Sequence, residues 1–206
     1  MVSSPERCRM DTPQRRPDRW SLHDFQEMEL NAPPNEKWEL IDGIIHKMML
    51  GGSLAHNEIV VNLAVVLRTA LQAKGSASRV YSTNVPVVSE AIDTSTYPDI
   101  AVRCGPRVLD QKEMTDPVLL VEVLSRSTGE KDRYDKAEAY FRIPSVQHYL
   151  LVAQDRMDVT VLARGAADWV RTRFDAPEDA VEIAALGVSL TLSEIYENVK
   201  EIAGTY

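Results

Sequence analysis

Apolar positions at the start of the chain predict a short helix followed by a hairpin. Ser21 is a suitable N-cap for the helix, which must stop before Pro33 and Pro34. The segment 37–48 then has apolar residues on both sides of Asp42-Gly43, a dipeptide typical of tight hairpin turns. We therefore expect two antiparallel strands joined at Asp42-Gly43.

A long helix is predicted next, followed by short strands. After Gly51-Gly52-Ser53, apolar residues recur at helical spacing until Gly75, which closes the element. The recurring positions are Ile59, Leu63, Val66, Leu67, Ala70 and Leu71. Beyond this helix, the longest in the chain, apolar runs predict one or two strands within 79–88, then a strand that carries Asp99 and another that carries Glu122.

The second half of the chain predicts one more helix and a group of strands. The helix opens at Thr128-Gly129-Glu130 and must end near Pro144. Three strands follow, at 148–152, 158–162 and 169–174, and a short closing helix starts near Leu192. The pattern indicates an α/β or α+β fold, a mixed central β-sheet flanked by helices.

Length and terminal composition predict a single domain. At 206 residues the chain is long enough for one core and short for two. Residues 1–20 read as a flexible polar leader, and 21–206 as the domain. The leader has no apolar core of a signal peptide, and no stretch approaches the roughly 20 apolar residues of a membrane span. We expect a cytoplasmic protein with no membrane partner.

Charge and cysteine content restrict the function further. The formal net charge of -8 argues against indiscriminate nucleic-acid binding. Lys and Arg residues nevertheless gather in the central third of the chain, so a local basic face stays open as an alternative to scattered surface charge. Cys8 and Cys104 form neither a disulfide framework nor a zinc pattern.

Glu122 interrupts the apolar run 118–124, where an ionised carboxylate is costly. Burying it without a partner costs several kcal/mol, so a cation, a metal or strong hydrogen bonds must compensate it. Asp99 heads a second apolar run, 100–102, and the two carboxylates converge if these strands pair. Hard oxygen ligands favour Mg²⁺ or Mn²⁺, which activates water for phosphodiester hydrolysis. A turn-capping role for Asp99 remains the alternative.

Each of three other candidate residues has a functional and a structural interpretation. Lys136 shares one helix side with Asp132 and Tyr140, so it either stabilises a charged transition state or forms a solvated pair with Asp132 worth about 0.3–0.5 kcal/mol. Glu39 is either a third acid beside the metal or an exposed strand residue. His56, near the start of the long helix, either touches phosphate or is structural.

Ordered motifs across residues 20 to 200 resemble the Uma-type family of restriction endonucleases, within the PD-(D/E)xK nuclease superfamily. They are Trp38-Glu39-Leu40-Ile41-Asp42-Gly43, His56, Pro98-Asp99-Ile100, Val121-Glu122-Val123-Leu124-Ser125 with Ser127-Thr128, and Asp132, Lys136 and Tyr140. The resemblance implies a restriction-endonuclease-like core in which Asp99 and Glu122 bind the ion and Glu39 adds a third carboxylate. His56, Ser125 and Arg126 become candidate substrate contacts.

Two departures from the family pattern matter. The lysine expected two residues after the second acid is Leu124, and the resemblance implies that Lys136 on the following helix replaces it. The segment 145–153 lacks the usual glycine-valine turn, tyrosine-tryptophan pair and final aspartate, and we interpret that strand as structural.

The functional hypothesis is a Mg²⁺- or Mn²⁺-dependent DNA endonuclease. Asp99, Glu122 and Glu39 serve the metal, and Lys136 positions the attacking water. Two alternatives stay open: a catalytically silent binding or scaffold module with the nuclease fold, and a hydrolase of small phosphoesters. A homodimer would suit the cutting of both strands of a duplex, although no residue indicates one.

Overall fold

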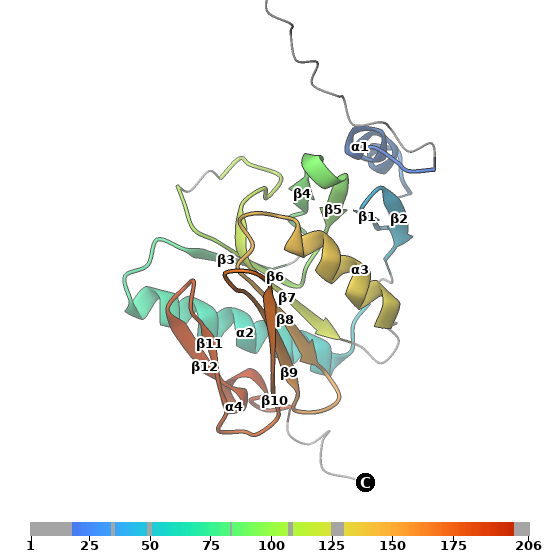
Figure 1. Ribbon diagram of the computed structural model, residues 1–206. Helices are drawn as coiled ribbons and strands as arrows, with labels where there is room; N and C mark the ends of the chain where they lie inside the picture. Colours follow the sequence, from blue (N-terminus) through green and yellow to red (C-terminus); the bar gives the residue numbers. More distant parts are fainter. Residues whose placement is uncertain are drawn as a thin grey trace, which may run out of the picture.

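A six-stranded mixed sheet forms the centre of the computed structural model, which describes residues 18–33, 36–48, 51–82, 84–106, 109–124 and 130–199, with side chains from residue 135 in the last range. The strand order is β10 (Trp169–Phe174), β9 (Val159–Arg164), β8 (His148–Ala153), β7 (Pro117–Leu124), β6 (Ile100–Arg103) and β3 (Arg79–Ser82). The fold is α+β, as predicted (Figure 1).

Two smaller sheets accompany the central one. A four-stranded sheet has the order β2 (Ile44–Lys47), β1 (Trp38–Ile41), β5 (Thr94–Thr96) and β4 (Val87–Ser89). Between β4 and β5 lies the 3₁₀ turn η1 (Glu90–Ile92). A hairpin of β11 (Ala180–Ile183) and β12 (Val188–Thr191) forms the third sheet.

The strands β7 and β8 are parallel, whereas the other neighbours in the central sheet are antiparallel. A parallel pair needs a crossover connection, because the chain must return to the end of the sheet at which the first strand began before the second strand can start. The helix α3 (Glu130–Phe141) lies in this crossover. Its position over the sheet is therefore a direct consequence of the β7–β8 pairing.

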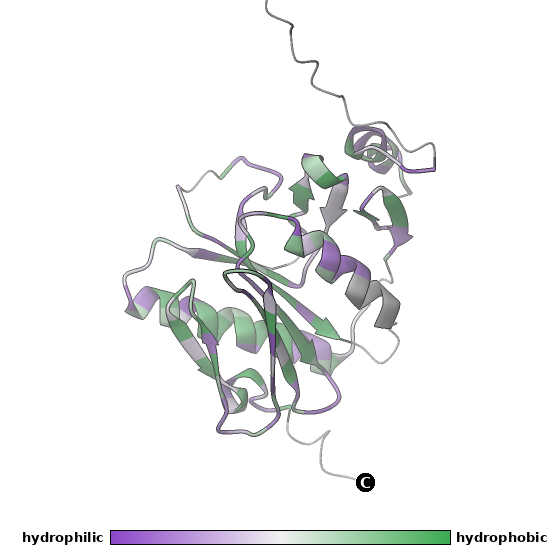
Figure 2. Ribbon diagram, viewed as in Figure 1, coloured by the Kyte–Doolittle hydropathy of each residue, from purple (hydrophilic) through white to green (hydrophobic). Residues whose placement is uncertain are grey.

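One face of the central sheet is covered by α2 (Leu54–Ala73), the β11–β12 hairpin and α4 (Leu192–Ile195), as Figure 1 shows. The helix buries Ile59, Leu63, Leu67 and Leu71 at helical spacing against strand residues of β6 to β9. Figure 2 shows the same contrast, with hydrophobic central strands and hydrophilic loops. Of the described helices, α2 alone has the length and composition of a membrane span, features that it shares with core helices.

The opposite face is covered by α3 and the four-stranded sheet (Figure 1). Buried Ala137, Tyr140 and Ile143 pack here against Leu120 and Tyr149 of the central sheet. At the periphery, α1 (Leu22–Leu30) packs its buried Phe25 against the four-stranded sheet. These contacts place β1 and α3 beside the same end of β7.

Most of the predicted elements are confirmed. Ser21 caps α1 by accepting a hydrogen bond from Asp24 N, and Asp42-Gly43 joins β1 to β2 with positive φ at both residues. Gly75 follows the long helix at φ +63°. The strand β5 and the hairpin β11–β12 were not predicted, and the first strand after Asp99 begins one residue later, at Ile100. Residues 1–17 of the proposed leader lie outside the described residues.

Truncating Leu63 should destabilise the protein strongly. The side chain is 0% exposed at the centre of α2, so Leu63→Ala should lower the free energy of unfolding by about 2–5 kcal/mol. Urea unfolding measures the loss. Val65→Ala is the matched control, because that side chain is 57% exposed on the same helix and should change the free energy little. Equal losses in both variants would contradict the packing of α2.

Candidate active site

Three charged side chains from three elements meet beside β7. The Lys136 ammonium on α3 lies 2.9 Å from Glu39 Oε1 on β1 and 3.0 Å from Glu122 Oε1 on β7. Only 14% of the Lys136 side chain is exposed, so both carboxylates are bridged inside the protein. This is the positive partner that an acid within an apolar strand requires.

Glu122 owes its position to the alternation of β7. Its neighbours Val121 and Val123 are buried in the cluster under α2, so the Glu122 side chain points to the opposite face, toward α3. Glu39 is nearly fully buried and also accepts a hydrogen bond from Tyr97 N at 2.8 Å. Glu39 therefore has an amide and an ammonium as donors, and it is not the exposed strand residue of the alternative reading.

The Lys136 amine stays protonated in this site. Burial lowers the pKa of Lys136, but the charges of Glu122 and Glu39 outweigh burial and raise that pKa above its ordinary value. A lysine in this state supplies a fixed positive charge and cannot act as a general base at neutral pH.

The environment of the Glu122 carboxyl, in contrast, disfavours its charged form. Burial raises its pKa, the charge of Lys136 lowers it, and the charges of Asp99 and Glu39 raise it, with a net result of about 7. A carboxyl with so high a pKa is short of positive charge even with an ammonium in contact. Perturbed carboxyls of this kind are typical of functional sites.

Asp99 lies between the strand layer and α2. Its Oδ2 accepts a hydrogen bond from Val123 N at 2.7 Å and lies 3.3 Å from His56 Nε2. The hydrogen bond to Asp99 raises the pKa of His56, because the carboxylate favours the imidazolium. His56 therefore orients Asp99 in this structure, and a direct phosphate contact remains a prediction.

Two tyrosines line the Glu122 carboxyl. The Tyr140 hydroxyl lies 3.0 Å from Thr96 Oγ1 and 3.3 Å from Glu122 Oε1, fully buried beneath α3. The Tyr149 hydroxyl is also buried and has no hydrogen-bond partner among the described residues, while the nearby Glu122 charge contributes to a raised Tyr149 pKa. Tyr149 thus brings an unused donor close to the acid cluster.

Removing the Tyr140 hydroxyl should cost stability. Tyr140→Phe removes the buried hydroxyl that contacts Thr96 and Glu122, so the free energy of unfolding should fall by about 1–3 kcal/mol. Chemical denaturation checks this value. Tyr81→Phe, on the half-buried β3, is the control and should be nearly neutral; a similar loss there would contradict the assignment.

The donor chemistry fits a hard dication. Glu39, Asp99 and Glu122 carry three formal negative charges against the ammonium of Lys136, with His56 adding a positive charge only when protonated. Oxygen donors with excess negative charge suit Mg²⁺ or Mn²⁺. Within the described residues, however, no three His, Cys, Asp or Glu side chains are already grouped around one point. Glu39 and Glu122 both contact Lys136 in this structure, and the roles of Glu39, Asp99 and Glu122 as metal ligands remain a prediction.

The sequence residues divide into three groups. Glu39, Glu122 and Lys136 converge, and Asp99 stands beside them with His56. Ser125 and Arg126 lie outside the described residues, as does the Asp132 side chain, so these predictions stay open. Thr96, Tyr97 and Tyr149 were missed, because only the strand register brings them near Glu122.

Two relatives match most of the chain. The "Uncharacterized protein slr1290" of Synechocystis sp. is 32% identical over 168 residues, 80% of this chain and 85% of the relative. A second Synechocystis protein, sll1609, is 32% identical over 157 residues, 74% of this chain and 87% of the relative.

A solved structure and a family model complete the comparison. A crystal structure described as a "putative nuclease belonging to DUF820", from Anabaena variabilis, covers 87% of this chain and 98% of its own with a TM-score of 0.69; at 18% identity it shows the fold. The family model Uma2, described as "Putative restriction endonuclease", matches residues 22–193. The chain therefore belongs to the Uma2 family and has the restriction-endonuclease-like fold of that nuclease.

Proposed function

We propose that the protein is a Mg²⁺- or Mn²⁺-dependent endonuclease that hydrolyses phosphodiester bonds of DNA. The observation that carries the proposal is the buried contact of Lys136 with Glu39 and Glu122, at 2.9 and 3.0 Å, beside the carboxylate of Asp99. Membership of a nuclease family supports the same chemistry.

Asp99 and Glu122 would hold the dication in this proposal. When bound, the ion polarises a phosphate oxygen and lowers the pKa of a coordinated water. His56 and Val123 N fix the orientation of Asp99 through its Oδ2, which leaves Oδ1 for the ion. The raised pKa of Glu122 also favours a dication at this place, because a neighbouring dication stabilises the ionised form of the carboxyl.

Lys136 would supply a positive charge to the reaction, and Glu39 would position Lys136. The protonated Lys136 amine offers a fixed positive charge to the phosphate as negative charge develops, and it can donate a hydrogen bond to the attacking water. Glu39, held by Tyr97 N, keeps the ammonium beside Glu122. Glu39 is thus a positioning residue for Lys136 in this structure.

The direct test is cleavage of DNA by the purified full chain. We expect nicking or cutting of a plasmid and a labelled duplex with Mg²⁺ or Mn²⁺, and none with a chelator. Matched RNA and a small phosphodiester ester are included as substrates. Cleavage of the small ester without polymer cleavage would support the phosphoesterase alternative and overturn the endonuclease.

One observation favours the silent nuclease-fold module as a second candidate. The described residues hold no ready three-ligand group, and the Lys136 bridge to Glu39 and Glu122 also satisfies the requirements of a purely structural ion pair. Calorimetry with Mn²⁺ separates the two candidates. Binding that is lost in Glu122→Gln supports the nuclease, whereas no binding supports the silent module.

A further inference from the structure

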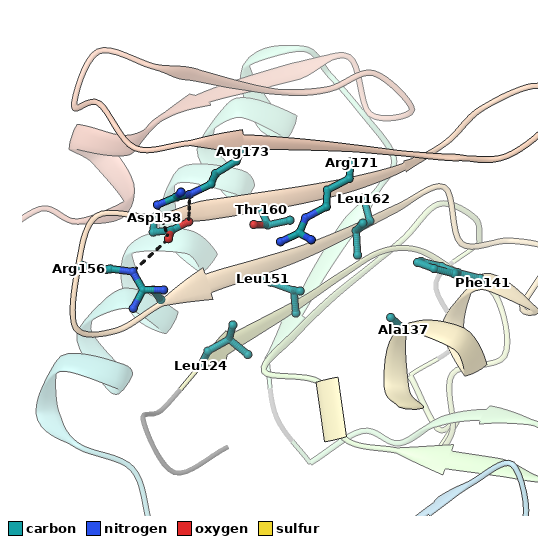
Figure 3. Close-up of a pocket in the computed structure, with 11 residues that line it drawn as sticks. Leu124, Ala137, Phe141, Leu151, Arg156, Asp158, Thr160, Leu162, Arg171 and Arg173 are labelled. Atoms are coloured by element: carbon teal, nitrogen blue, oxygen red, sulfur yellow. Dashed lines mark hydrogen bonds and ion pairs between the residues drawn. The ribbon is translucent and has the colours of Figure 1, made fainter. Parts of the chain in front are cut away.

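A cavity of about 410 Å³ is lined by residues of β7, β8, β9, β10 and α3 (Figure 3). Leu124, the next side chain after Glu122 on the same face of β7, lines the cavity together with Leu151, the residue paired with Glu122 on β8. Ala137, adjacent in sequence to Lys136, lines it from α3. Residues next to Glu122 and Lys136 therefore line the cavity, which places it on the side of the sheet that carries the candidate catalytic residues.

Strand register connects Glu122 to an arginine at the sheet edge. Residues paired across strands share a face, and successive pairings run from Glu122 to Leu151, then Thr160, then Arg173. The neighbouring row ends in Arg171, paired with Leu162. With strands about 4.8 Å apart, the backbones of residues 122 and 173 are separated by about 14 Å.

Three arginines line the far end of the cavity. Asp158 accepts hydrogen bonds from Arg156 Nε at 3.1 Å and from Arg173 at 3.0 and 3.2 Å, so one carboxylate orients two guanidinium groups. Arg171 points from β10 into the space between Thr160 and Leu162, as Figure 3 shows. No hydrogen bond or ion pair holds its guanidinium within the described part of the chain. Two further carboxylates lie at this end, Asp155 at 3.2 Å from Arg156 and Asp175 at 3.7 Å from Arg173, so Arg156 and Arg173 are balanced by acids and Arg171 is the arginine of the lining that offers its charge.

We propose that this cavity binds a backbone phosphate of the DNA strand, a few nucleotides from the phosphodiester that is cut, with Arg171 as the principal ligand and Arg173 beside it. This inference rests on the proposed function. Each DNA strand carries one phosphate per about 3.4 Å of axis, so the interval from Glu122 to the arginines spans roughly four phosphates or fewer. An anionic polymer also complements the Arg171 guanidinium, which no acid of the described residues pairs with, on a chain whose net charge is -8.

The experiment measures binding of a labelled oligodeoxynucleotide to full-length Asp99→Asn protein, which should bind without cutting. Adding Arg171→Gln should weaken binding about tenfold, the effect of losing one charge-assisted contact. The slope of log affinity against log salt should also fall by about one. Arg68→Gln is the matched control, because Arg68 is an exposed arginine on α2, on the opposite face. It should retain the affinity.

A second arm locates the phosphate. A series of oligodeoxynucleotides carries a single uncharged methylphosphonate, moved along the strand one position at a time. The protein that retains Arg171 should bind most of them normally and should lose affinity at only one or two positions. The Arg171→Gln protein should show no loss of affinity at those positions. Arg171→Gln should keep the Mn²⁺ affinity and thermal midpoint of the parent, since Arg171 is exposed and remote from Glu122.

The outcomes separate this inference from the proposed function. If wild-type protein cuts DNA and Arg171→Gln binds and cuts like Arg68→Gln, the phosphate site is wrong and the nuclease stands. If wild-type protein neither binds nor cuts DNA, both are overturned. Uniform weakening at every methylphosphonate position in both proteins would also overturn a site at Arg171.

Discussion

Asp99→Asn should reduce DNA cleavage by about 10³-fold or more, because it removes one of the two carboxylates available to the dication. A bound metal stabilises the transition state by several kcal/mol, and each 1.36 kcal/mol corresponds to a factor of ten in rate. The fold should persist, because the asparagine oxygen can still accept the hydrogen bond from Val123 N that Asp99 accepts at 2.7 Å. Cleavage rates of a labelled duplex with Mn²⁺ measure the effect.

The control for Asp99 is another aspartate with no part in the site. Asp110 is exposed in the loop between β6 and β7, so Asp110→Asn makes the same chemical change at the surface. Its cleavage rate should match wild type, and both variants should keep the wild-type circular dichroism spectrum. Undiminished cleavage by Asp99→Asn would rule out the role assigned to Asp99.

Lys136→Met should reduce the cleavage rate by about 10²–10³-fold and destabilise the metal-free protein. Loss of a positive charge aimed at the transition state costs about 10²–10³ in rate. Without the ammonium, Glu39 and Glu122 form a buried pair of like charges, and breaking a buried ion pair costs about 3–5 kcal/mol of stability. Thermal unfolding with a chelator should therefore show a much lower midpoint than wild type.

Added Mn²⁺ distinguishes the two roles of Lys136. A dication near Glu122 compensates part of the lost charge, so Mn²⁺ should raise the thermal midpoint of Lys136→Met without restoring cleavage. Lys47→Met is the control, because Lys47 forms an exposed pair with Glu36 that contributes at most about 1 kcal/mol. A Lys136→Met protein that cuts DNA at the wild-type rate contradicts the assignment.

The local elements were predictable because their signals are local. A serine N-cap, an Asp-Gly turn and a helical apolar stripe each depend on a few neighbouring residues, and Ser21, Asp42-Gly43 and α2 follow them. The hairpin β11–β12 was missed because its strands are only four residues each, too short for their alternation of exposed and buried positions to stand out as a strand signal. Such short strands are stabilised by packing against α2 and α4, which the sequence does not display.

The acid cluster was predictable for a different reason. A charge in the middle of an apolar strand requires a partner, so Glu122 alone indicated a buried site. That the partner is Lys136, and that Glu39 also contacts it, follows from the docking of α3 and β1 on β7. The surroundings contributed by Thr96, Tyr97 and Tyr149 depend on register and could not be read from spacing.

The division of the acid cluster between two sheets has a consequence for biosynthesis. Glu39 lies in the four-stranded sheet, Glu122 lies in the six-stranded sheet, and Lys136 lies on the crossover helix α3. A nascent chain that has formed only the first sheet holds no assembled centre. The constellation comes into being only after ribosomal synthesis has passed the crossover and the two halves have docked, so a polypeptide that stops before residue 136 lacks the assembled centre.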